Sequence, residues 1–357
     1  MSGAAGATPR NTHPRTEHGG EPVRRLPETE AVLKVRHAVR GWLAEYAPQE
    51  RSVAVALSGG ADSLALMAAA VVEADQVDAL VVDHRLQTGS DAVAAAAASA
   101  ALKLGCRSAR VLTVDVGSDG GPEAAARQAR YGALDAARDG LPVLLGHTLD
   151  DQAETVLLGL ARGSGGRSIQ GMAAFTAPWG RPLLGVRRAT TRQLCADLGL
   201  TPHEDPHNSA PEFTRVRLRT EVLPLLEEVL GGGVAPALAR TAEQLRDDGV
   251  VLDTLAAELL RTAGADSGTA DAIGPVADGA TLSIETLATA PAALRRRAMR
   301  AWLLAGGAKA LTDRHLRAVD ELVTSWRGQG GVAVGGGVPG HRLVVAREHG
   351  RLTLRLR

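Results

Sequence analysis

Apolar and polar residues follow two different rhythms along residues 28–230. Short continuous apolar runs, typical of strands buried in a parallel sheet, occupy residues 51–57, 77–84, 108–116 and 141–147. Stretches with helical spacing of apolar residues occupy 28–46, 63–74, 90–105, 121–140 and 150–163. Because strands alternate with helices, the pattern predicts an α/β fold with a doubly wound, Rossmann-like parallel sheet.

The rhythm changes after residue 230, where three glycines end a helix that begins near Phe213. Long helical stretches are expected over residues 235–262 and 292–326, separated by a loop at 263–280. Residues 330–357 read as two or three short strands with glycine turns. We therefore expect a disordered tail at 1–27, a catalytic domain with a linker helix at 28–230, and a mostly helical domain with a small β end at 231–357.

Composition narrows the class of protein. The chain has 357 residues, 45% of them hydrophobic, which suits two or three globular domains. Its two cysteines, Cys106 and Cys195, form no CxxC motif, so a disulfide framework and a thiolate metal cage are not expected. No apolar run of about 18 residues and no secretory signal are visible, which predicts a cytoplasmic protein without membrane contact.

The net charge is zero, with 40 basic and 40 acidic side chains, so composition alone does not indicate a nucleic-acid partner. Arginines nevertheless gather in three groups: Arg181, Arg187, Arg188 and Arg192; Arg215, Arg217 and Arg219; Arg295, Arg296, Arg297 and Arg300. Each group taken singly is typical of a solvated helix face. The alternative is a local phosphate-binding patch, which we expect at Arg295, Arg296 and Arg300.

The stretch VALSGGADSLAL, residues 55–66, has the order of a phosphate-binding turn between a strand and a helix. Glycines at 59 and 60 allow backbone amides to approach an anion, and the helix start adds its positive end. The lysine of a Walker A loop is absent, which favours a pyrophosphate leaving group over γ-phosphoryl transfer. An ordinary turn capped by Asp62 and Ser63 is the alternative.

Polar residues end three of the predicted strands. Asp83 and His84 follow the second strand, and His147 follows the fourth, with Asp150, Asp151 and Glu154 just beyond it. The carboxyl ends of parallel strands meet at one edge of a sheet, where ligands bind. The acidic group is suited to Mg²⁺ or to an incoming amine, unless it only complements a helix dipole.

Together the motifs resemble one family. SGGADS is similar to the pyrophosphate loop of the N-type ATP pyrophosphatases, the PP-loop family. Within it, GHTLDDQAE, RGSG and HEDPHNSAPEFTRVRLRTEVLPLL resemble tRNA(Ile)-lysidine synthases, over roughly residues 30–330. The resemblance implies that ATP adenylates C2 of the wobble cytidine in CAU-anticodon tRNA(Ile). Free L-lysine then displaces AMP to give lysidine.

The resemblance also implies residue roles at the matching positions. ATP would be held by Ser58, Gly59, Gly60, Ala61, Asp62, Ser63, Asp83 and His84, and Mg²⁺ by Asp62 and Asp151. The catalytic and lysine-receiving groups would be Asp62, His147, Asp150, Asp151 and Glu154. Residues facing the target base and tRNA would be Glu123, Arg127, Arg130, Arg162, Asp205, Asn208, Arg215, Arg217 and Arg219, and residues 162–171 would form a mobile lid.

Two departures and two rivals accompany this hypothesis. Val216 stands where the family carries asparagine, and the chain ends soon after the helical domain. The rivals are another PP-loop enzyme, for tRNA thiolation or amide formation, and a non-catalytic RNA-binding protein on a degenerate scaffold. Thiolation enzymes of this type usually need paired cysteines. A homodimer stays open.

Overall fold

The computed structural model describes residues 26–49, 51–85, 89–115, 121–163, 165–205, 212–265, 281–338 and 341–357. Residues 1–25 of the predicted tail at 1–27 lie outside that description. The side chains of Pro122 and Glu123 lie outside it too. The chain divides into two compact units. Unit 1 holds the described residues up to Glu154 and Met172–Pro236, and unit 2 holds Thr155–Gly171 and Ala237–Arg357.

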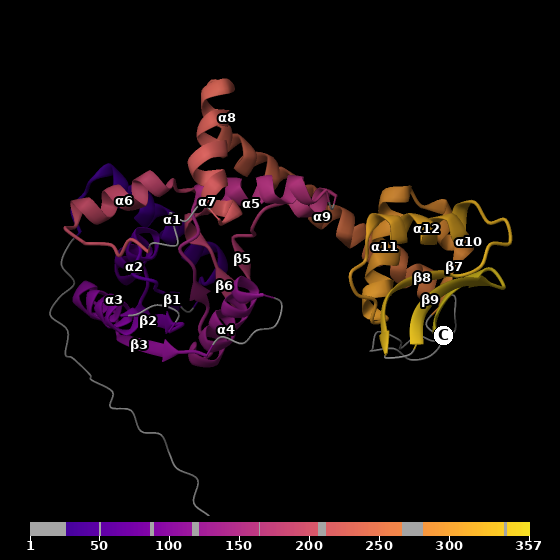
Figure 1. Ribbon diagram of the computed structural model, residues 1–357, viewed down its shortest axis with the longest axis horizontal. Coiled ribbons are helices and arrows are strands. Elements are labelled where there is room, and N and C mark those ends of the chain that lie inside the picture. Colours follow the sequence, from indigo (N-terminus) through magenta and orange to yellow (C-terminus); the bar gives the residue numbers. More distant parts are fainter. Residues whose placement is uncertain are drawn as a thin grey trace, which may run out of the picture. The chain divides into compact units, whose positions relative to one another are not determined.

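Unit 1 is built on a six-stranded sheet (Figure 1). Its strands are β1 Ser52–Ala56, β2 Gln76–Asp83, β3 Ser108–Thr113, β4 Val143–Leu144, β5 Phe175–Thr176 and β6 Trp179–Gly180. They lie in the order β3-β2-β1-β4-β6-β5, and every neighbouring pair is parallel except β5 with β6. The strand order changes direction between β1 and β4, so the ligand edge lies where these strands end. The predicted doubly wound sheet is confirmed.

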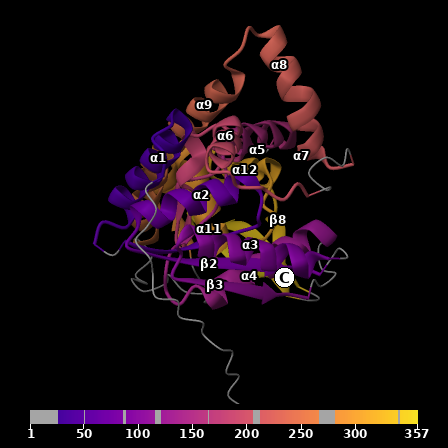
Figure 2. The same cartoon turned by 90° about the vertical axis from the view of Figure 1, so that its left-hand side faces the viewer.

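Alternate residues of β1 serve two different cores, as the two faces of a strand require. Val53 and Val55 pack with α1 Glu30–Tyr46, α2 Ala61–Glu73, α3 Ser90–Leu104 and α6 Arg188–Asp197. Figure 2 shows α1 and α2 side by side on this face. Ala54 and Ala56 pack on the other face with Leu134 of α4 Pro122–Ala137. The small side chains of α2 and α3 let these helices lie close to the sheet.

Two local features of unit 1 differ from the sequence pattern. The fourth strand, expected over 141–147, pairs only at Val143–Leu144, because the chain leaves the sheet towards α5 Leu149–Arg162. The elements β5, β6 and α6 were not expected. Two strands of two residues each carry no readable period, and β5 and β6 are set by pairing rather than by pattern.

Beyond α6, unit 1 ends in a continuous helical run made of α7 Thr214–Arg217, a π-helical turn Leu218–Val222 and α8 Leu223–Val229. Both views show α8 standing clear of the parallel sheet (Figures 1 and 2). Leu225, Val229 and Leu230 there are exposed.

Unit 2 combines the long helix α9 Val234–Ala265 with an antiparallel sheet and three shorter helices. The sheet has the order β7-β10-β9-β8, with β7 Thr281–Ser283, β8 Val332–Val338, β9 His341–Glu348 and β10 Arg351–Leu356. Its helices are α10 Ile284–Thr289, α11 Ala292–Ala305 and α12 Asp313–Thr324. A core around Trp302, Val319, Leu343 and Leu352 joins sheet and helices.

The prediction of a single helix over residues 292–326 is wrong. The chain breaks after Ala305 at Gly306 and Gly307, where Gly307 has a positive φ of 86°. A new helix then starts with a capping box between Thr312 and His315. The first residues of the loop expected at 263–280 belong to α9, which continues to Ala265, and residues 266–280 lie outside the described part of the chain.

The arginine patch expected in this unit also needs correction. Arg295 is buried, and its Nε donates to Asp320 Oδ1 at 2.5 Å while Nη1 donates to the Ala290 carbonyl. Arg296 pairs with the same carboxylate at 2.9 Å. A phosphate could reach Arg295 only by breaking a buried ion pair, so Arg295 belongs to the core.

Candidate active site

The loop after β1 has the geometry of an anion cradle. Gly59 has a φ of 81°, which favours glycine, and its carbonyl accepts a hydrogen bond from the His203 amide at 2.9 Å. The Ser63 hydroxyl accepts from the Ser58 amide at 3.2 Å and donates to the Gly60 carbonyl at 3.0 Å. Gly60 caps α2 without a side-chain bond, so the helix start offers its amides to a ligand.

A second glycine brings the two halves of the site together. A Cβ on Gly146, just after β4, would lie 3.1 Å from the Asp62 carbonyl carbon and the Ser63 nitrogen. Because no side chain is present there, the chain leading to α5 can pass directly over the start of α2. His147, Asp150 and Asp151 are thereby placed beside the phosphate loop.

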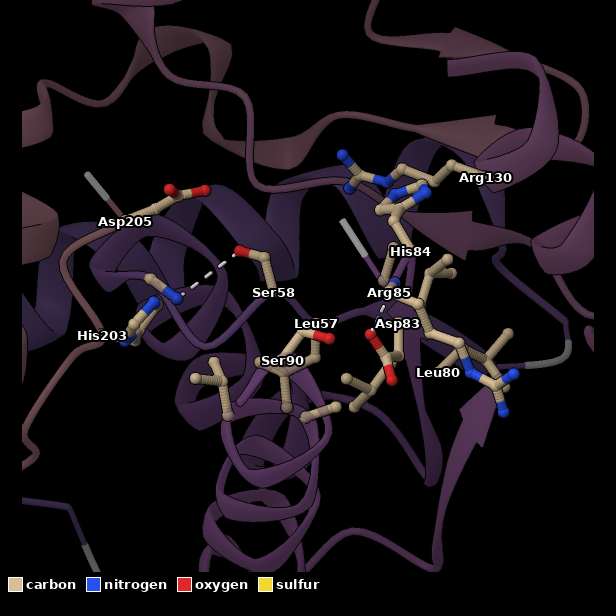
Figure 3. Close-up of a pocket in the computed structure, with 16 residues that line it drawn as sticks. Leu57, Ser58, Leu80, Asp83, His84, Arg85, Ser90, Arg130, His203 and Asp205 are labelled. Carbon is tan, nitrogen blue, oxygen red and sulfur yellow. Dashed lines mark hydrogen bonds between the residues drawn. The ribbon is translucent and has the colours of Figure 1, made fainter. Parts of the chain in front are cut away.

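A cavity of about 430 Å³ opens at this edge, within the size range of ligand pockets. Its lining includes Ser58, Gly60, Asp83, His84 and, from a later loop, Asp205. Figure 3 shows Ser58 near the centre, with His84 and Arg130 on one side and His203 and Asp205 on the other.

Beside the loop lies an acidic wall, which we define as Asp62, Asp150, Asp151 and Glu154. Glu154 is fully buried, and its Oε1 lies 2.9 Å from Arg219 Nε and 3.3 Å from Arg188 Nη1. Asp151 accepts from Arg188 Nη2 at 2.6 Å and from the Thr148 amide and hydroxyl at 2.7 Å each. Both of these carboxylates therefore have partners within the protein.

Asp62 and Asp150 are held by the same segment of chain. The Thr191 hydroxyl donates to Asp62, and Arg188 Nε lies 3.5 Å from its other oxygen. Asp150 accepts from the Arg188 amide at 2.7 Å and pairs with Arg187 at 3.0 Å. The start of α6 thus closes the acidic wall.

Burial and charge act differently on two of these carboxylates. Burial raises the pKa of Asp62, against the opposing effects of Thr191 and Arg188. Burial also disfavours the charged form of Asp151, but Arg188 and the Thr148 hydrogen bonds outweigh it and leave the pKa of Asp151 below its usual value. Asp151 is therefore held ionised.

The site also holds a group of basic residues, which we call the basic wall and define as His84, Arg127, Arg130, His147 and Arg181. Burial lowers the pKa of His147 to about 4, helped by the three arginines, so this imidazole is neutral at pH 7. Burial and Arg130 lower the pKa of His84 as well. Among the described residues, no carboxylate forms an ion pair with Arg127, Arg130 or Arg181.

Buried polar atoms of the basic wall lack hydrogen-bond partners within the described part of the protein. Nδ1 of His84, Nδ1 of His147 and Nε of Arg181 are buried with no hydrogen-bond partner among the described residues. Arg127 lies 4.9 Å from the centre of the Tyr131 ring. Three arginines without a carboxylate partner among the described residues, together with these buried unpartnered nitrogens, suit an anionic ligand.

The remaining predicted residues are spread more widely. Arg219 forms an ion pair with Glu154 of the acidic wall, whereas Arg217 is exposed and pairs with Glu221 at 3.0 Å. Arg215 is exposed on α7, and Arg162 is exposed at the end of α5. Asn208 and the side chain of Glu123 lie outside the described residues. Val216, at the departure from the family pattern, is buried.

The expected lid is anchored in the structure. Gln170 Nε2 donates to the Leu245 carbonyl at 2.8 Å, and Arg246 of α9 donates to the Gln170 carbonyl. A Cβ on Gly159 would lie 1.9 Å from the Ser168 carbonyl oxygen, so glycine is required for this packing. The described part of residues 162–171 is therefore packed against helices of unit 2.

Sequence reasoning missed Thr191 and His203, and it treated Arg181 and Arg188 only as members of a charge cluster. Arg188 is the first residue of α6, where the macrodipole disfavours a cation. Because α6 was not expected from the sequence, no signal for the role of Arg188 was available there.

The residues fit a nucleotide-bound metal better than a dedicated metal cage. Among the described residues, no group of three or more His, Cys, Asp or Glu side chains is placed to hold a metal ion. Mg²⁺ bound with ATP needs only one or two carboxylates besides the phosphates, and Asp62 and Asp151 are at hand.

Within the described chain, no single helix is long and apolar enough to span a membrane. One sharply bent pair, Thr214–Val229 with Val234–Ala265, meets the length and composition criteria only when joined.

A parallel sheet with a lysine-free phosphate loop at its switch point defines a PP-loop ATP pyrophosphatase fold. The match of residues 30–226 to the PP-loop domain model agrees. A second match covers residues 282–353 with the TilS substrate binding domain. The chain belongs to the tRNA(Ile)-lysidine synthase family, as the motifs indicated.

Relatives support this directly. The tRNA(Ile)-lysidine synthase of Nocardia farcinica is 77% identical over 322 residues, covering 90% of this chain and 97% of the relative. That of Rhodococcus erythropolis is 69% identical over 329 residues, covering 92% and 97%. Among solved structures, a U34-tRNA thiolase from Methanococcus maripaludis superimposes with a TM-score of 0.50 and 18% identity, over 60% of this chain and 79% of that one, which shows the fold alone.

Proposed function

We propose that this protein ligates free L-lysine to C2 of the wobble cytidine in CAU-anticodon tRNA(Ile), using ATP and releasing AMP and pyrophosphate. The observation that carries the proposal is the adjacency of a lysine-free phosphate loop and the acidic wall, which share contacts through Arg188. One supplies a place for ATP, and the other supplies carboxylates beside it.

In the first step, the C2 carbonyl oxygen of cytidine attacks the α-phosphorus of ATP, and pyrophosphate leaves. The amides at the start of α2, with Ser58 and Ser63, would hold phosphate oxygens. The basic wall faces the same cavity through His84 and Arg130 and would neutralise charge that develops on the phosphates. Mg²⁺, held by Asp62 and Asp151 together with the phosphates, would supply further charge neutralisation.

In the second step, the ε-amine of lysine attacks C2, and AMP departs with the former carbonyl oxygen. An ammonium must first be bound and deprotonated, and carboxylates are suited to both tasks. Asp151 and Glu154 already bond Arg188 and Arg219, so lysine must share or displace these contacts. His147 lies near Asp151, but with a pKa of about 4 it is too weak a base to take a proton from an ammonium and is suited only to accept a hydrogen bond.

The decisive experiment combines the purified protein with labelled lysine, ATP and CAU-anticodon tRNA(Ile). Lysine should become covalently attached to the tRNA, with AMP and pyrophosphate as the nucleotide products. ADP and inorganic phosphate as tRNA-dependent products would contradict the proposal. A tRNA with cytidine 34 replaced by uridine is the matched control.

The cysteines argue against sulfur transfer by the same fold. Cys106 and Cys195 are both buried, and burial raises the pKa of each thiol to about 11. A buried, protonated thiol is a poor nucleophile. Lysidine formation therefore remains the favoured chemistry for this PP-loop enzyme.

We carry two further hypotheses forward with this function. A cytoplasmic location follows from the tRNA substrate. A homodimer is supported by three exposed apolar side chains, Leu225 and Val229 on α8 and Leu230 just beyond its end, which a second copy could cover. Sedimentation velocity of the full chain and of an L225E/V229E variant would test the homodimer.

A further inference from the structure

Arg188 lies at a position where a positive charge is expected to destabilise a helix. It is the first residue of α6, at the positive end of the helix dipole, where acidic residues are preferred. Its side chain is nevertheless mostly buried and turns towards the acidic wall. The cost of a cation at that end implies that the guanidinium serves its carboxylate partners.

The three nitrogens of the guanidinium reach three different carboxylates. Nε lies 3.5 Å from Asp62, Nη2 lies 2.6 Å from Asp151, and Nη1 lies 3.3 Å from Glu154. Asp62 belongs to α2, directly after the phosphate loop, whereas the other two belong to α5. A planar fork spreads its donors over three nitrogens and suits such a set, whereas the ammonium of a lysine carries its donors on a single atom.

The neighbouring arginines do not duplicate this arrangement. Arg219 contacts Glu154 and Asp151, both on α5, and Arg187 contacts Asp150. Arg188 therefore joins the carboxylate nearest the ATP loop to those suited to an amine. Because Arg188 shares one positive charge among them, a change at Asp62 would alter how strongly Arg188 holds Asp151 and Glu154.

We propose that Arg188 is a positioning residue that couples the two half-reactions, by holding Asp62 in register with Asp151 and Glu154. This inference rests on the proposed function and deepens it. Without that link, adenylated cytidine would form beside a poorly placed amine, and water would attack C2 instead. Such hydrolysis returns cytidine and AMP, so pyrophosphate is released without a lysine being attached.

The test compares pyrophosphate release with lysine attachment in full-length R188M and R188K proteins. Arg192 is the matched control, since it lies one turn further along α6, is exposed, and pairs only at 3.3 Å with the exposed Glu204. We expect wild type and R192M to give equal amounts of the two products. R188M should lose roughly 10- to 100-fold in the rate of lysine attachment and release several-fold more pyrophosphate than lysidine, because misplaced groups cost about that much.

R188K should lie between wild type and R188M in both rate and product ratio, since it keeps the charge but not the fork. A purely structural role would lower both products together and leave their ratio unchanged, and that result overturns the proposal. If R188M does not fold, an R188K protein with wild-type rates and ratio overturns it equally. Absence of pyrophosphate release by the wild type would instead contradict the proposed function itself.

Discussion

The acidic and basic walls of the site are both rich in ionisable side chains, but they differ in how many of their polar atoms have partners within the protein. The carboxylates of the acidic wall already bond arginines, two threonine hydroxyls and backbone amides. The basic wall leaves Nδ1 of two histidines and Nε of Arg181 buried without partners among the described residues. We infer from this difference that the protein itself fixes the positions of the acidic side chains, whereas the basic side chains are suited to a ligand that brings negative charge.

The largest expected effect comes from Asp62, the carboxylate of the acidic wall that directly follows the phosphate loop. D62N removes a charge next to the phosphate loop while keeping the shape of the side chain. We expect tRNA-dependent pyrophosphate release to fall by roughly 10²- to 10³-fold, the usual effect of losing one group that stabilises a transition state. A stopped-flow pyrophosphate assay measures it, and a rate within threefold of wild type would place the metal elsewhere.

The next prediction concerns His147 and the pH dependence of stability. Its folded pKa of about 4 lies below the ordinary value near 6.5, so below pH 6.5 the unfolded chain binds a proton that the folded chain does not. Stability from this group is complete above pH 6.5 and is lost as pH falls towards 4, by up to roughly 3 kcal/mol.

Urea unfolding of wild type and H147Q between pH 4 and 7 measures this loss. H147Q should show a shallower fall in stability than wild type over that range. H37Q is the control, because His37 is exposed on α1. Equal slopes for wild type and H147Q would mean that burial does not keep this imidazole neutral.

Glu154 tests whether the saturated acidic wall can still receive an amine. In E154Q the buried side chain keeps its size but loses the charge facing Arg188 and Arg219. We expect the KM for lysine to rise about 10- to 100-fold, equivalent to a charge-assisted hydrogen bond of roughly 1.5–3 kcal/mol. Pyrophosphate release should persist. A lysine titration that matches wild type would show that the amine binds elsewhere.

Removing the charge of Arg130 in the basic wall is expected to have the smallest effect of these changes. Burial lowers the pKa of Arg130, and no described carboxylate compensates it, so removing the charge relieves a cost. R130M should be as stable as wild type or more stable by about 1 kcal/mol, while the KM for ATP or tRNA rises roughly tenfold. Thermal unfolding and initial rates together test it, and a clear fall in stability would make Arg130 a structural residue.

Much of the fold was readable because its signals are local. Apolar runs such as residues 51–57 and helical stretches such as 90–105 became β1 and α3 within a residue or two. The break at Gly306 and Gly307 was not read, because each flanking helix continues the same apolar rhythm. The strands β5 and β6 were not read either, since pairing with a partner defines them.

The candidate site divides in the same way. Which residues are candidates for the chemistry is visible in SGGADS and GHTLDDQAE, because a turn, a helix start and a carboxylate spacing are local patterns. The contacts among them were not visible. Arg295 and Arg188 both lie in arginine-rich runs, yet one is locked to Asp320 in a core and the other bridges three carboxylates of the site.

By itself, the sequence determined the alternation of strands and helices, the phosphate loop, and the supply of acids and arginines at one edge of a sheet. The tertiary structure alone decided how these charges meet, since Arg188 and Asp62 are 126 residues apart and Arg219 and Glu154 are 65 apart. The physical reason is that a charge pair depends on distance and burial in space. Those are properties of the packed sheet edge, and no local pattern of residues encodes them.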